Sequence, residues 1–341
     1  MSWSKTRART LKTVARRSGA GPARVAVALA AAILCLPGAA LAEEGGSGHY
    51  FPGSMASFID AVPPSPTFIV RLNVLDYGGS ASLSRPIPIA GLTTLGAHAD
   101  STGLGLTMLW RPPIDLGPRW SYAMSATIPY VWLGVNADVA TTLPGGAPAS
   151  VARSSNTDAI GDIVLMPLML NYNVSRDFNI NFRVAEYAPT GSYEVGRLSN
   201  TGKNFWTTEP TLALMYFGQK NGIEASVFTG FDFNSENNAT HYQTGTQFHV
   251  DGTLAQHFPA LGGLLGLGVN AYDYQQIAGD GGSGASLGAF EGSSIGVGPV
   301  ASYVGKVAGL NTVWELKWID EVQTHDRLQG STLWFKVLSK F

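Results

Sequence analysis

The sequence contains a single cysteine among 341 residues, and this residue, Cys35, lies in an apolar stretch close to the N-terminus. Residues 43–341 contain none, which excludes disulfide bonds, thiolate nucleophiles and cysteine metal ligands from that part of the chain. An absence of thiols suits a protein that works in an oxidising compartment outside the cytoplasm.

Charge is also scarce, because Asp, Glu, Lys and Arg make up only 13% of the chain. Seven of the 22 basic residues precede residue 43, where the first acidic residue appears. The remainder holds 15 basic against 24 acidic residues and carries a net charge near −9. Nucleic-acid binding requires clustered Lys and Arg, so we expect no nucleic-acid partner.

Residues 1–42 have the pattern of a secretory signal peptide. A basic start is followed by an apolar core at 25–36, a Pro37-Gly38 breaker and the small residues of Ala40-Leu41-Ala42. The apolar core is shorter than the roughly 20 residues of a membrane-spanning helix. We therefore predict export with cleavage after Ala42, to the periplasm or to the outer membrane of a Gram-negative cell, the latter if the rest of the chain forms a barrel.

Residues 43–66 are rich in glycine and proline, which disfavours a regular element. Two interpretations stay open for this leader segment. It is either a mobile periplasmic tail or a plug that folds into the protein, and a plug would place His49, Tyr50 and Phe51 near a solute path.

From residue 67 onward, apolar and polar residues alternate with the period of two that is typical of strands. In the run 177–187, Phe178, Ile180 and Phe182 alternate with Asn179, Asn181 and Arg183. Twelve such runs are predicted, at 67–77, 103–111, 119–138, 161–174, 177–187, 208–217, 222–233, 245–257, 263–275, 290–304, 310–322 and 328–341.

Short and long gaps alternate between these runs. The long gaps include 78–102, 140–160 and 188–207, and the region 80–100 has the appearance of an enlarged first loop. A soluble sandwich has no reason to sort its loops in this way, whereas a transmembrane barrel has tight periplasmic turns and larger outer loops. No long apolar helix follows residue 42, and closure of a barrel satisfies every backbone group in lipid.

The predicted fold is therefore all-β, a single antiparallel up-and-down transmembrane β-barrel of about 12 strands over residues 67–341, with short periplasmic turns and longer extracellular loops. Outer-membrane lipid is the expected surrounding. Interfacial aromatic girdles are predicted from Tyr130, Trp132, Tyr187, Trp206, Trp318 and Trp334.

The chain ends on Phe341 after an alternating strand, which resembles the C-terminal insertion signal of bacterial outer-membrane barrels. The resemblance implies the barrel-assembly machinery as a partner. An ordinary edge strand is the alternative interpretation.

Polar residues at inward parity would line a lumen wider than that of an eight-stranded barrel. Their mixed charges disfavour selection for ions of one sign, and salt bridges that fill the lumen are the alternative role for each of them. The candidates for a solute path are Arg71, Asn73, Asn179, Asn181, Arg183, Glu224, Asp232, Glu315, Lys317 and Lys336.

A set of ordered marks resembles the family of meta-pathway phenol-degradation proteins, which are predicted outer-membrane barrels. These marks are Gly45-Gly46-Ser47-Gly48-His49-Tyr50, Pro52-Gly53, Gly161-Asp162, Pro189-Thr190-Gly191-Ser192-Tyr193, Asn200, Gly202, Asn204, Trp206, Pro210, Asn234, Glu236-Asn237, Thr240-His241-Tyr242, Gly245, Phe248-His249, Asp251, Tyr274-Gln275, Asp280-Gly281 and Gly298-Pro299. The resemblance implies a transporter linked to aromatic catabolism, with no catalytic residue to carry over.

The leading hypothesis is an outer-membrane channel for small hydrophobic or aromatic compounds, with no enzymatic activity and no cofactor. One alternative is a lipase- or esterase-like barrel using His249 and Asp251, with Thr244 or Thr246 nearby, although no serine motif accompanies them. Another is a structural or adhesive barrel without a solute path. Calcium at the rim, bound by Asp232, Glu236 and Asp280, is a weaker expectation, since their spacing matches no known loop.

Overall fold

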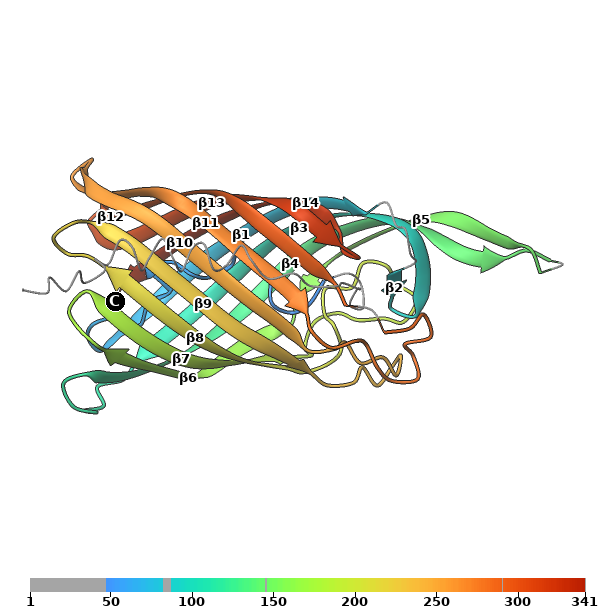
Figure 1. Ribbon diagram of the computed structural model, residues 1–341, viewed down its shortest axis with the longest axis horizontal. Helices are drawn as coiled ribbons and strands as arrows, with labels where there is room; N and C mark the ends of the chain where they lie inside the picture. Colours follow the sequence, from blue (N-terminus) through green and yellow to red (C-terminus); the bar gives the residue numbers. More distant parts are fainter. Residues whose placement is uncertain (1–46, 82–86, 145, 290, 341) are drawn as a thin grey trace, which may run out of the picture. The chain divides into compact units, whose positions relative to one another are not determined.

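The computed structural model describes residues 47–81, 87–144, 146–289 and 291–340. The predicted signal peptide and Phe341 lie outside these ranges. Within them, one short 3₁₀ helix precedes a series of antiparallel strands (Figure 1). The elements are η2 (Phe58–Asp60), β1 (Thr67–Ala81), β2 (Ile87–Ile89), β3 (Leu92–Arg111), β4 (Trp120–Thr142), β5 (Pro148–Ile160), β6 (Ile163–Asn173), β7 (Phe178–Ala188), β8 (Thr207–Phe217), β9 (Ile223–Asn234), β10 (Gln247–Ala260), β11 (Gly263–Gln276), β12 (Ser293–Val307), β13 (Leu310–His325) and β14 (Gln329–Lys340).

Twelve of these strands close into a barrel. The ring runs β1-β3-β4-β6 and then in chain order to β14, and β14 pairs with β1 from Ile69↔Lys340 to Ser80↔Gln329. The other two, β2 and β5, pair only with β3 and β4, respectively. The predicted all-β, 12-stranded antiparallel barrel is confirmed.

Period-two alternation places one face of each strand in the lumen and the other on the outside. In β13, Glu315 and Lys317 are buried, while Leu316 and Trp318 are 46% and 49% exposed. The same outward exposure of large apolar side chains recurs around the ring, at Leu106 in β3, Phe182 in β7 and Leu333 in β14. An apolar belt of this extent is the surface that lipid would cover. No helix among the described residues is long and apolar enough to cross a membrane.

Loop lengths alternate as predicted, so the two ends of the barrel differ. One end carries tight turns, including Leu261-Gly262 between β10 and β11 and Ala308-Gly309 between β12 and β13. All four of these residues have positive φ, between 51° and 83°. This is the conformation that two-residue type I′ hairpins require, and glycine at the second position removes its steric cost.

Two loop predictions were wrong. Residues 78–102 do not form one large loop, since β1 continues to Ala81 and β3 already begins at Leu92. Residues 140–160 contain the end of β4 and all of β5, which forms a hairpin with β4 that extends past the neighbouring strands (Figure 1). Both stretches are dominated by glycine, alanine, serine and threonine, which give no apolar alternation, and their strand structure comes from pairing with the adjacent strand.

The girdle prediction was wrong for two of its six aromatic residues. Tyr187 and Trp334 are 9% and 8% exposed and lie on the inward face of their strands. Trp132, Trp206 and Trp318 are about half exposed on the outside, as predicted. Trp334 shares its parity with the buried Lys336, so its orientation follows from the pleat of β14.

Candidate functional site: the lumen and its N-terminal segment

The N-terminal segment, residues 47–66, lies against the inner wall of the barrel and is held there by ion pairs. Asp60, 4% exposed, accepts hydrogen bonds from Arg71 of β1 at 2.7 Å and from Lys336 of β14 at 3.1 Å. Lys336 also contacts Glu315 of β13, whose carboxylate accepts a hydrogen bond from Ser57 Oγ. A buried carboxylate is stable only with such partners, so Asp60 joins the segment to β1 and β14, while Ser57 joins it to β13.

Backbone groups of the segment are satisfied by side chains of the wall. Lys317 Nζ donates to the carbonyl oxygens of Gly53 and Met55, the latter at 2.7 Å. The Phe58 N–H donates to Glu224 at 2.7 Å, and Arg183 donates to the Asp60 carbonyl at 3.1 Å. These contacts replace the backbone pairing that an irregular segment cannot make with itself.

His49 connects the segment to the long-loop end of the barrel. Its Nε2 lies 2.8 Å from Asp162 Oδ2, and its Nδ1 lies 2.6 Å from Thr207 Oγ1. Asp162, which lies between β5 and β6, also accepts the backbone N–H groups of Gly191 and Lys203. Burial opposes ionisation of this carboxyl, but the hydrogen bonds from His49 and from the two N–H groups outweigh it and hold the pKa of Asp162 below its usual value.

Tyr50 lies deeper and is 1% exposed. Its hydroxyl donates to Asp251 Oδ2 at 2.7 Å, and its ring stacks on His249 with centroids 3.7 Å apart. The Gly53 N–H donates to the other oxygen of Asp251 at 2.7 Å. Asp251 of β10 therefore binds the segment at two points.

A cavity of about 430 Å³ remains between the segment and the long-loop end. Its wall is mainly apolar, with Leu75, Ile87, Ile89, Leu133, Val135 and Leu198 among the lining residues. Three aromatic rings meet on one side, where Phe51 lies edge-on to both Tyr77 and Trp334 at 5.6 Å between centroids. Volume and lining match those of small-molecule sites, which are concave and largely apolar with a few polar groups.

All ten predicted solute-path residues face the lumen, but they have different surroundings. Arg71, Asn73 and Lys336 line the cavity. Arg71 and Lys336 also hold the N-terminal segment, as Arg183, Glu224, Glu315 and Lys317 do. The remaining residues interact within the wall: Asn73 with Thr107, Asn179 with Asn171, Asn181 with Arg183, and Asp232 beside Glu209 and His249.

Three residues that make contacts in the lumen were not among the candidates predicted from the sequence. Asp60 stood in a segment without periodicity, and Asp162 stood at the start of the run 161–174, whose nearly continuous apolar residues assign no inward face, so it was noted only as a family mark. Glu209 could have been found, since it shares inward parity with Thr207, Thr211 and Ala213 of β8.

Two other sequence hypotheses are not supported by the geometry. Asp232, Glu236 and Asp280 do not form a calcium site: Asp232 lies beside Glu209 and His249 in the lumen, Glu236 pairs with His241, and Asp280 binds Tyr242 and Gly245. His249 and Asp251 do approach each other, at 3.3 Å, but the second imidazole nitrogen faces the Glu209 carboxylate and not a threonine hydroxyl. The hydrolase arrangement of nucleophile, base and orienting group is therefore not formed by these residues.

The family described as "Putative MetA-pathway of phenol degradation" matches residues 83–337 of the sequence. The chain belongs to this family. The match includes the marks from Gly161-Asp162 onward, so the resemblance noted in the sequence is confirmed. No curated protein matches the chain at the sequence level.

Among solved structures, the COG4313 outer membrane channel from Pseudomonas putida F1 aligns with a TM-score of 0.62 at 14% identity, covering 86% of this chain and 100% of that one. A Pseudomonas aeruginosa FadL homologue aligns with a TM-score of 0.40 at 6% identity, covering 82% and 90% of the two chains. The first alignment shows that this member of the family has the same barrel fold as the P. putida channel.

Acidification is expected to loosen the His49 end of the segment. The pKa of Asp162 is lowered in the folded protein, so its hydrogen bonds contribute stability above the usual value of 3.8, and this stability is lost as pH falls through the lowered pKa. Hydrogen exchange around residues 47–50 should therefore speed up as pH falls below about 4, after correction for the intrinsic rate. In Asp162→Asn the same amides should already exchange faster at neutral pH. Asp158→Asn, which alters an exposed contact with Tyr130, is the control. Equal exchange in the wild type and both variants would show that Asp162 does not hold the His49 end of the segment.

Proposed function

We propose that this protein is an outer-membrane channel for small hydrophobic or aromatic molecules, with the long loops facing outward and residues 47–66 acting as a plug. The observation that carries the proposal is the apolar cavity above the N-terminal segment inside a closed barrel. Membership of a family described by phenol degradation supports an aromatic solute.

The cavity has the chemistry that an aromatic molecule with one polar group requires. Transfer of an aromatic ring from water to apolar walls is favourable at roughly 25 cal/mol per Å² of buried apolar surface. The rings of Phe51 and Trp334 offer edge and face contacts to such a solute. Asn73 and Thr107 lie on the same wall and provide hydrogen-bonding groups for a hydroxyl.

Below the cavity, the plug occupies the lumen. Met55 and Ala56 pack against the inward side chains Ala213, Met215 and Phe228 of β8 and β9. A solute that crosses to the short-turn end by the lumen requires the plug to move. A bound solute would displace the plug by contacting Phe51, which belongs to the plug and lines the cavity.

Single-channel recording with and without phenol tests this proposal. The wild-type protein should show small conductance that phenol modulates, and deletion of residues 47–64 should raise the conductance several-fold because the lumen is emptied. Unchanged conductance after the deletion would refute the plug. A wild-type channel indifferent to phenol at millimolar concentration would refute the aromatic solute while leaving the plug standing.

A further inference from the structure

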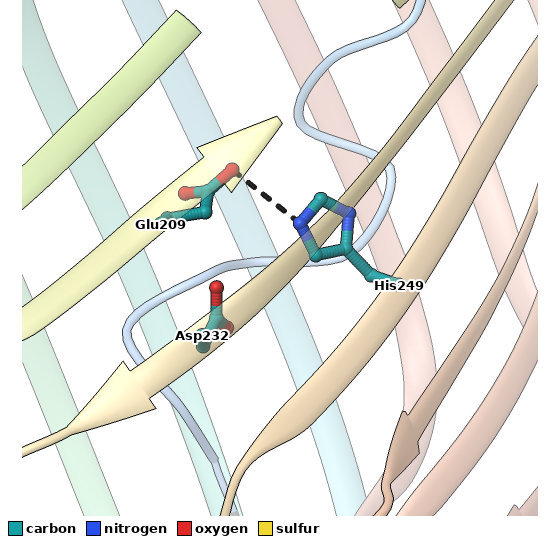
Figure 2. A group of neighbouring side chains, drawn as sticks. All are labelled: Glu209, Asp232 and His249. Atoms are coloured by element: carbon teal, nitrogen blue, oxygen red, sulfur yellow. Dashed lines mark ion pairs between the residues drawn. The ribbon is translucent and has the colours of Figure 1, made fainter. Parts of the chain in front are cut away.

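Three potential metal ligands meet on the inner wall, where the ring of Tyr50 stacks on one of them, His249. Glu209 of β8, Asp232 of β9 and His249 of β10 each offer one ligand atom, and these atoms lie within 4.8 Å of one another. All three residues are 0% exposed. Figure 2 shows their side chains converging from three neighbouring strands, with Glu209 directed at the His249 ring.

The spacing within this cluster suits a small cation. Glu209 Oε1 and His249 Nε2 are 3.4 Å apart, and a tetrahedral ion with bonds of about 2.0–2.2 Å holds its ligand atoms roughly 3.4 Å from one another. His249 Nε2 faces the Glu209 carboxylate at 3.4 Å without forming a hydrogen bond to it. A nitrogen in this position is available as a ligand.

His249 and Glu209 are each oriented by neighbouring polar side chains, as the ligands of known metal sites are. The other nitrogen of His249 lies 3.3 Å from Asp251, which matches the carboxylate–histidine–metal arrangement. Glu209 accepts hydrogen bonds from Tyr187 at 2.6 Å and Thr211 at 2.8 Å, so its carboxylate is held in place. Neutral His249 could then donate through Nδ1 and coordinate through Nε2.

The negative charges around His249 also favour a bound cation. Glu209, Asp232 and Asp251 surround one imidazole in a space closed to solvent. The guanidinium of Arg183 donates hydrogen bonds to Asn181 and to the Asp60 carbonyl, and it attracts Glu209 without a hydrogen bond between them. Buried carboxylates in such numbers are costly unless a cation offsets them, and a bound divalent ion supplies the largest local charge.

We propose that Glu209, Asp232 and His249 bind one divalent metal ion of the zinc type, and that this ion stabilises the docked plug. One nitrogen and two carboxylate oxygens are ligands that Zn²⁺ accepts. The link to the plug runs through Asp251, which orients His249 and accepts hydrogen bonds from Tyr50 and Gly53. The ring of Tyr50 closes the site against the lumen.

The test uses full-length protein purified from outer membranes, unfolded with a chelator and refolded in detergent with Zn²⁺. After removal of loosely held ions by dialysis, mass spectrometry should find about one zinc per wild-type chain. His249→Gln and Asp232→Asn should each lower this content at least about tenfold. His257→Gln is the matched control, because His257 is also buried beside a carboxylate, Glu224, but outside the cluster.

X-ray absorption at the zinc edge should show only nitrogen and oxygen ligands. Proteolysis within residues 47–66 should be slower in the zinc-loaded wild type than in the metal-free protein. The proposal is overturned if refolded wild type retains no zinc, which would leave an imidazolium between Glu209 and Asp251. Equal zinc in wild type, His249→Gln and Asp232→Asn would also overturn it by placing the ion elsewhere.

Discussion

Asp60→Ala is expected to release the plug from the barrel wall. Lys336 is 2% exposed and Arg71 is half-buried, and both point at the Asp60 carboxylate. Without it, Arg71 loses this ion pair, and Lys336 is left with Glu315, which also pairs with Lys317. Removing one partner of a buried ion pair costs about 3–5 kcal/mol, because the remaining charge is left buried without compensation.

Because Asp60 supplies the ion pairs of the segment with β1 and β14, the docked state of this half of the segment should be strongly depopulated. Single-channel conductance should rise toward that of the deletion of residues 47–64, and the segment should become sensitive to protease. Ser65→Ala is the matched control, since it removes only an exposed hydrogen bond from Lys340 in the same segment. Asp60→Ala protein with wild-type conductance and protease resistance would show that the ion pairs do not hold the plug.

Ala99→Trp is expected to abolish the effect of phenol on conductance. Ala99 of β3 is 7% exposed and lines the cavity, and it is paired with Val135 on the neighbouring strand β4. An indole at this position would project into the 430 Å³ cavity that we propose as the solute site. Aromatic binding should weaken at least about tenfold, which corresponds to about 1.4 kcal/mol.

The control for this substitution is Leu106→Trp on the same strand. Leu106 has the opposite parity and is 42% exposed on the outer belt, where tryptophan is compatible with a lipid-facing surface. Phenol titration of the conductance in both variants measures the effect, with thermal unfolding to show that the barrels are intact. A wild-type response to phenol in Ala99→Trp would place the solute outside the cavity.

The sequence by itself determined the barrel. Alternation is a local property of each strand, and the lipid-facing and lumen-facing sets of β7, β13 and β14 could be separated by parity alone. The count of strand-like runs predicted the number of strands, and the sorting of short and long loops predicted the two distinct ends. Where alternation was absent, as in β5 and the first part of β3, the strands were missed, because their pairing depends on a neighbouring strand.

Only the tertiary structure decided what the inward residues do. Parity placed Arg71, Glu315 and Lys336 in a lumen, but their partner, Asp60, lies in an aperiodic segment whose position no local pattern encodes. The same holds for Glu209, Asp232 and His249, which come from three strands and meet because hydrogen-bond register aligns those strands. Periodicity is a short-range signal, whereas charge compensation and ligand convergence depend on distances that exist only after the barrel closes around the plug.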